Sequence, residues 1–231
     1  MHIIDSASIS AFVAGKLTSN FSQGTSLYNS AYIASRIFLP FILIILAYAI
    51  ENGATLNEFM FYSMLHLLPT SILIILIIVN INFFQKFFQR IIFFREDKTL
   101  PEAVIFSIFS KKHNKRLLTF TEKFSINKII LKKILVSSLA YVFLSSGFFI
   151  SFSISYYFEE FRMTISQLTT VFHGLGQILL AFFIDPMLSR SIDCKDENLW
   201  KSNLYSIMFG RLLAYLVVIF MSLIIFLNIE N

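Results

Sequence analysis

The amino-acid sequence predicts an all-α, polytopic integral membrane protein with about six transmembrane helices. Hydrophobic residues make up 56% of the 231 positions and charged residues only 14%, whereas an ordinary soluble domain is roughly 45–50% apolar and about one quarter charged. Apolar stretches of about twenty residues, the length that crosses a bilayer as a helix, recur along the chain. A soluble core of this size cannot enclose 28 Phe residues beside long Ile and Leu runs. Lipid is therefore the expected solvent.

The membrane spans follow from these apolar stretches. Residues 2–19 are rich in Ser and Ala and predict a short, polar first membrane helix, since no basic segment precedes them as in a secretory signal. We treat residues 1–231 as a single transmembrane domain. Five longer stretches predict clear spans at residues 26–48, 59–83, 131–157, 162–185 and 204–228.

Loop charges predict the orientation. Between Lys86 and Lys133 the chain has twelve Lys and Arg residues and only four Asp and Glu residues. Cytoplasmic loops retain an excess of basic residues, so the long basic loop at residues 84–128, between the third and fourth helices, is expected on the cytoplasmic side. Alternation of the spans then places both termini outside.

The long loop contains two basic segments. Residues 83–92 predict an amphipathic helix with apolar pairs on one face and Gln, Lys and Arg on the other. We expect it to lie in the headgroup layer, with a gating role as the alternative. The segment Lys111–Arg116 predicts contact with acidic headgroups; its four bases also suit nucleic acid, but the membrane context favours lipid and we expect no nucleic-acid partner.

Arg36 is the outstanding ionisable residue, because it lies near the middle of the second span, where a charge is expensive. One face of this span is expected to carry polar residues at helical spacing: Ser22, Ser26, Asn29 and Arg36. Arg36 has two interpretations. It either pairs with a carboxylate such as Asp5 to hold helices together, or forms an anion site in a cavity.

The fifth span repeats this pattern. One face is expected to carry Thr170, His173, Gly174 and Gln177, and Gly174 and Gly176 are expected to permit close approach of a neighbouring helix. His173 is either a hydrogen-bonded interior histidine or part of a proton relay.

Arg211 lies in the last span, nearer its predicted cytoplasmic end. Asp185 reaches the same membrane surface from the fifth span, so Asp185 and Arg211 are expected to form an ion pair or part of a proton relay. Alternatively, Arg36 and Arg211 form two steps of a cationic path.

Several chemistries lack a sequence motif. There is no GxxxxGK[ST] phosphate loop, no HExxH and no GxSxG. The single Cys194 excludes an internal disulfide framework. We therefore expect a transporter rather than an enzyme, with no catalytic residues, no metal and no cofactor.

Two stretches resemble the Amj-type lipid II flippases, bacterial proteins that substitute for the MurJ flippase. The amino-terminal stretch matches at Asp5-Ser6, Ala14-Gly15, Ser26-Leu27-Tyr28-Asn29 and Ser35-Arg36. The second stretch matches at Asp185-Pro186, Leu188-Ser189, Asp193 and Gly210-Arg211. One departure is Phe12, which stands where the family usually has a basic residue.

The resemblance implies translocation of an undecaprenyl-pyrophosphate-linked peptidoglycan precursor, lipid II, from the inner to the outer leaflet of the bacterial cytoplasmic membrane. The partners would be this anionic polyprenyl lipid and the surrounding membrane lipids. On this hypothesis the pyrophosphate binds Arg36 and Arg211, and the path is lined by Asp5, Ser26, Asn29, Thr170 and Gln177.

Three alternatives stay open. One is a flippase for another undecaprenyl-linked lipid or for undecaprenyl phosphate, which needs the same cationic cavity. Another is a non-catalytic membrane partner in an envelope complex. A lipid-phosphate enzyme is the least supported, because His66 and His173 lie within spans without a converging carboxylate.

Overall fold

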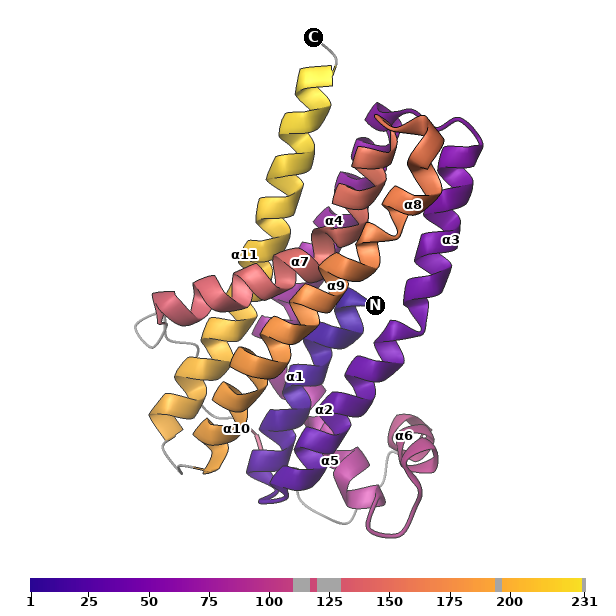
Figure 1. Cartoon of the computed structure of the whole chain (residues 1–231). Helices are drawn as coiled ribbons and strands as arrows, with labels where there is room; N and C mark the ends of the chain where they lie inside the picture. Colours follow the sequence, from indigo (N-terminus) through magenta and orange to yellow (C-terminus); the bar gives the residue numbers. More distant parts are fainter. Residues whose placement is uncertain (110–116, 120–129, 194–196, 230–231) are drawn as a thin grey trace. The chain divides into compact units, whose positions relative to one another are not determined.

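A computed structural model describes residues 1–109, 117–119, 130–193 and 197–229, and the secondary structure of this part of the chain is entirely helical (Figure 1). The expected Lys111–Arg116 segment and Cys194 lie outside the described residues. The chain divides into two compact units, Met1–Leu39 with Leu73–Phe124 (unit 1) and Pro40–Ile72 with Ser125–Asn231 (unit 2), which are described separately. The helices are α1 (His2–Leu17), α2 (Phe21–Arg36), α3 (Phe38–Glu51), α4 (Leu56–Val79), α5 (Ile81–Phe94), α6 (Leu100–Phe109), α7 (Leu131–Ser155), η2 (Glu159–Phe161), α8 (Arg162–Ser166), α9 (Leu168–Leu179), η3 (Leu180–Ile184), α10 (Asp185–Asp193) and α11 (Glu197–Ile229).

Within the described residues, five helical segments are long and apolar enough to cross a membrane. Their outer surfaces are apolar as well: Ile44 and Ile45 in α3 are 65% and 66% exposed, and Val79 at the end of α4 is 72% exposed. Such a surface is stable in lipid and not in water. The segments are Phe21–Glu51, Leu56–Val79, Leu131–Ser155, Arg162–Arg190 and Leu199–Asn228.

The first predicted span is a helix, but a short one. α1 has 16 residues, which at 1.5 Å per residue gives about 24 Å, less than the roughly 30 Å of a hydrocarbon layer. A sixth span therefore stays a prediction. The third predicted span, residues 59–83, is also shorter than expected at its end, because α4 ends at Val79.

In unit 1, α1 packs against α2 and α5. The turn between α1 and α2 passes through Ser19, whose φ of 56° is left-handed. Beside this turn the two backbones nearly touch: a Cβ on Gly15 would lie 2.7 Å from the Cα of Gly24. Only glycine permits that approach, which explains why Ala14-Gly15 is followed nine positions later by another glycine.

Helices α5 and α6 follow in the same unit. The Glu102 side chain caps the start of α6, accepting a hydrogen bond from the Thr99 N–H at 3.0 Å. In α5 the expected outward-facing glutamines are instead buried, with Gln85 and Gln89 both at 0% exposure. That part of the amphipathic prediction is wrong because Gln89 bonds the backbone of Leu118, accepting from its N–H at 2.9 Å and donating to its carbonyl at 2.8 Å.

In unit 2, α7 packs against α9 and α11. The contacts are close because small residues meet: a Cβ on Gly210 of α11 would lie 2.5 Å from the Cβ of Ser137 in α7. A Cβ on Gly176 of α9 would lie 2.6 Å from the Leu144 side chain of α7. Such small-residue contacts are typical of helix pairs in membranes.

Candidate functional site

Arg36 is positioned by a break in the helix that carries it. It is the last residue of α2, and α3 begins at Phe38 after a single turn residue. Pro40 lies four residues further on and has no N–H to donate to the Arg36 carbonyl, while its ring crowds the preceding turn. The sequence therefore interrupts the span Phe21–Glu51 directly after the arginine.

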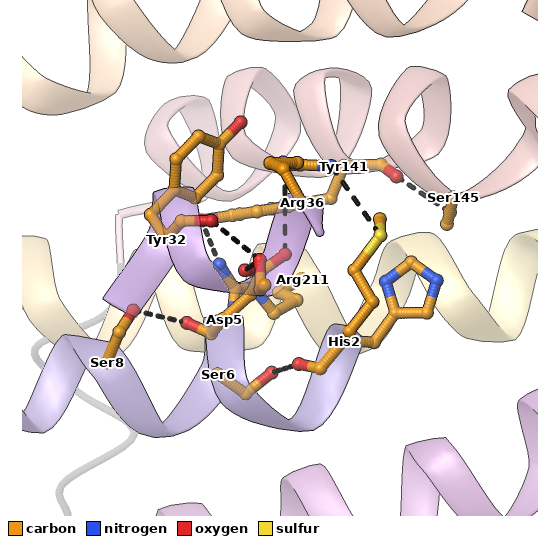
Figure 2. A network of polar contacts seen from close by, with 11 residues as sticks. His2, Asp5, Ser6, Ser8, Tyr32, Arg36, Tyr141, Ser145 and Arg211 are labelled. Carbon is orange, nitrogen blue, oxygen red and sulfur yellow. Dashed lines mark hydrogen bonds and ion pairs between the residues drawn. The ribbon is translucent and has the colours of Figure 1, made fainter. Parts of the chain in front are cut away.

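Asp5 of α1 faces Arg36 within unit 1 (Figure 2). The Asp5 carboxylate is 5% exposed, and its Oδ2 lies 3.7 Å from Arg36 Nη2. Asp5 Oδ1 accepts a hydrogen bond from the Ser35 hydroxyl. The structure thus contains the Arg36–Asp5 pair of the first interpretation, and two adjacent residues of α2 hold the same carboxylate.

The remaining contacts of Arg36 are weak. Its guanidinium lies 4.3 Å from the centre of the Tyr32 ring, and Nη1 donates to the Met1 sulfur at 3.9 Å. Within the part of the chain that the structure describes, its Nε and Nη2 atoms are buried without a hydrogen-bond acceptor. A guanidinium carries five N–H donors in a planar fork. Arg36 is therefore held in place while retaining donors that an anion is able to accept.

The rest of the expected stripe on α2 is less buried. Asn29 is exposed, and Ser26 is half-buried and accepts a hydrogen bond from Arg95 Nη1 at 3.3 Å. The buried face of α2 instead carries Gly24, Leu27, Tyr28 and Ser35. Phe12, the departure from the family pattern, packs against Tyr28 with ring centres 4.5 Å apart.

Arg211 lies in unit 2 and is 1% exposed. It donates from Nη2 to the Tyr141 hydroxyl at 2.6 Å, and its guanidinium lies 4.1 Å from the centre of the same ring. This contact, drawn in Figure 2, joins α11 to α7. The pairing of Arg211 with Asp185 stays a prediction, and so does a shared path with Arg36, which belongs to unit 1.

The expected face of α9 is only partly buried. Thr169, His173 and Gly176 are buried, whereas Thr170 and Gln177 are exposed. The His173 ring packs against Phe148, with ring centres 4.6 Å apart.

Thr170 also lines a cavity of about 340 Å³ in unit 2. Its lining includes the charged residues Glu51 and Arg162, so this cavity is partly polar.

A second helix irregularity follows α9. Residues Leu180–Ile184 form a π-helical turn directly before Asp185 and Pro186. Pro186 cannot donate to the carbonyl of Phe182, so the helix widens there instead of continuing regularly. Wide turns of this kind occur often at functional sites. The turn lies directly before the motif that begins at Asp185 and closes the fifth predicted span.

Comparison with protein families decides the relationship. The model of the family described as "Amj: Alternate to MurJ" matches residues 1–226. The chain belongs to the Amj family. No curated protein matches it, and no solved structure does.

In this Amj chain, sequence reasoning missed two polar partners. Ser35 was noted only as the neighbour of Arg36, yet its hydroxyl binds the same carboxylate. Tyr141 carried no signal in the sequence, because one tyrosine in an apolar span is unremarkable until Arg211 is placed beside it. Among the described residues of the Amj chain, no group of three or more His, Cys, Asp and Glu side chains is arranged to hold a metal.

Proposed function

We propose that this protein is a lipid flippase that moves lipid II from the inner to the outer leaflet of the bacterial cytoplasmic membrane. The observation that carries the proposal is Arg36, a cation at a helix break in a membrane span with donors left over after its contacts with Asp5. Membership of the Amj family, whose name denotes an alternate to MurJ, supports a transporter rather than a catalytic role.

The chemistry of the cargo fits this residue. Lipid II carries a pyrophosphate, and the planar guanidinium binds phosphate oxygens through paired, charge-assisted hydrogen bonds. Asp5 offsets the charge of Arg36 while the site is empty, so the arginine is tolerated in the membrane between transport events. An arriving phosphate then competes with Asp5 for the same donors.

Arg211 is proposed as a second cationic contact for the cargo. Neutral polar contacts to the cargo would come from Ser26, Asn29, Thr170 and Gln177, with Asp5 beside Arg36. Asp185 and His173 would serve as an ion pair or proton relay. The orientation follows the loop charges, with six spans, both termini outside and the long basic loop in the cytoplasm.

No nucleotide is required in this mechanism. An anion leaving a cell with a negative interior gains about 2.3 kcal/mol per charge per 100 mV. The isoprenoid tail stays in lipid during the crossing, so the protein handles only the polar headgroup. Outward export of lipid II is electrically favourable.

The test is a leaflet-resolved measurement of lipid II in bacteria depleted of their other flippase. We expect the wild-type chain to raise outer-leaflet lipid II, Arg36→Gln to abolish this, and Arg36→Lys to restore part of it. Arg190→Gln, which removes an exposed cation, is the matched control and should leave transport unchanged. Full transport by a normally inserted Arg36→Gln protein would refute the role of Arg36.

A second candidate is a non-catalytic membrane partner in an envelope complex. The Asp5–Arg36 ion pair favours it, because such a pair also holds α1 against α2 with no cargo. The same measurement separates the two functions. If the protein is only such a partner, even the wild-type chain would leave the amount of outer-leaflet lipid II unchanged.

A further inference from the structure

Unit 1 contains a large apolar cavity of about 830 Å³, formed by α1, α2, α5 and α6. This volume is in the range of pockets that hold organic ligands. Asp5 and Arg36 are not among its lining residues, so the cavity is separate from the candidate site described above. Fourteen of the eighteen lining residues are hydrophobic: Ile3, Ile4, Ala7, Leu27, Ala31, Ala34, Phe83, Phe84, Phe87, Phe88, Ile91, Leu100, Val104 and Ile108.

Two basic residues stand at this cavity. Lys86 and Arg90 are half-buried, lie four residues apart on α5 and both line the cavity. Residues at this spacing are neighbours on a helix, with Cβ atoms about 5–6 Å apart, so both reach one phosphate group. The other polar lining residues are Ser30 and Ser107, and none of the lining residues is acidic. The cavity thus combines an apolar interior with two cations and no counter-charge.

Neither α5 nor α6 is long enough to cross a bilayer. α5 has 14 residues and α6 has 10, which gives about 21 Å and 15 Å, too short to cross a bilayer. Lys and Arg side chains beside apolar surface extend their charges toward the polar headgroups. The apolar lining matches the acyl chains of a lipid, and the cations beside it match an anionic headgroup.

We propose that this cavity is a binding site for an anionic phospholipid. The acyl chains occupy the apolar space between α1, α2, α5 and α6, and the phosphate contacts Lys86 and Arg90. The site holds a membrane lipid rather than transported cargo, so it does not depend on the flippase assignment. The bound lipid attaches the α5–α6 segment to the cytoplasmic leaflet, because the basic loop is predicted to lie on that side of the membrane.

The first test uses native mass spectrometry of the full chain, released from vesicles of phosphatidylglycerol, phosphatidylcholine or both. We expect phosphatidylglycerol to stay bound in preference to phosphatidylcholine. Because each basic residue near a membrane surface contributes a several-fold preference for anionic lipid, Lys86→Gln with Arg90→Gln should lower phosphatidylglycerol retention about thirtyfold. The matched control is Lys132→Gln with Arg190→Gln, two exposed cations away from the cavity, which should retain the lipid.

The second test fills the cavity without changing charge. Ala31→Phe introduces a ring among the lining residues and should also expel phosphatidylglycerol, whereas Ala181→Phe, at an exposed position of unit 2, should not. Equal retention of the two lipids, or retention that survives both the charge and the filling variants, overturns the proposal. Displacement of phosphatidylglycerol by equimolar undecaprenyl phosphate also overturns it and assigns the cavity to a polyprenyl chain instead.

Discussion

Replacing Asp5 tests the ion pair at the centre of unit 1. With charges 3.7 Å apart, Coulomb's law at an effective dielectric constant near 20 gives an attraction of about 4.5 kcal/mol. The net value is smaller, because both ions lose hydration and the Arg36 side chain keeps 15% of its exposure. We expect Asp5→Ala to lower the free energy of unfolding by about 3 kcal/mol, mainly by leaving Arg36 buried without its counter-charge.

A double-mutant cycle isolates the pair. Unfolding free energies are measured in mixed micelles for the wild type, Asp5→Ala, Arg36→Ala and the double variant. We expect the double variant to be less destabilised than the sum of the single ones, with a coupling energy of about 1–2 kcal/mol. Asp97→Ala, at an exposed carboxylate, is the control and should couple to Arg36 by less than about 0.5 kcal/mol.

One result would refute this reasoning. A double variant as destabilised as the sum of the two single variants has a coupling energy near zero. It would mean that solvent screens the two charges or that each residue acts through other contacts, and it would leave Arg36 without the counter-charge that explains its place in the membrane.

Three further variants test other contacts. Gly15→Ala places a Cβ 2.7 Å from the neighbouring helix backbone and should cost about 1–3 kcal/mol of unfolding free energy, whereas Gly174→Ala, with open space around it, should cost nothing. Tyr141→Phe removes the hydrogen bond to buried Arg211 and should lower stability by about 1.5–3 kcal/mol. The cap of α6 lowers the pKa of Glu102 through the hydrogen bond from the Thr99 backbone N–H. This stabilisation should be present above pH 4.5, the ordinary pKa of the group, and disappear as the pH falls through the lowered pKa of Glu102. The measurement is the protection of the α6 amides, which is their exchange compared with the intrinsic rate at the same pH, and it should decrease.

The fold was predictable where the physical signal is local. Hydrophobic runs predicted five spans, and the structure contains an apolar helix of sufficient length at each of them. The amphipathic segment was predicted as a helix and is α5. The positions of the α5 glutamines were not predictable, because Gln85 and Gln89 bond the carbonyl of Leu118, about thirty residues further along the chain.

The candidate site was predictable in part. Arg36 and Asp5 were singled out as a pair because charges in a membrane need partners, and the structure brings them together. The burial of single residues on α9 was not predictable: Gly176 packs against Leu144 in α7, and Thr169 is buried whereas Thr170 is exposed. A helical periodicity predicts that some face is buried, but only the neighbouring helix decides which.

The sequence by itself determined that this is a multi-span helical membrane protein with arginines in its spans, because hydrophobicity and charge act along the chain and need no partner. Tertiary structure alone decided that Ser35 joins Asp5, that Tyr141 binds Arg211, and that Lys86 and Arg90 stand at an apolar cavity. These features bring together residues of different helices. Their interactions form only when the helices pack closely, as α1 and α2 do at Gly15 and Gly24. Composition predicts the solvent of a chain, whereas side-chain partners follow from packing.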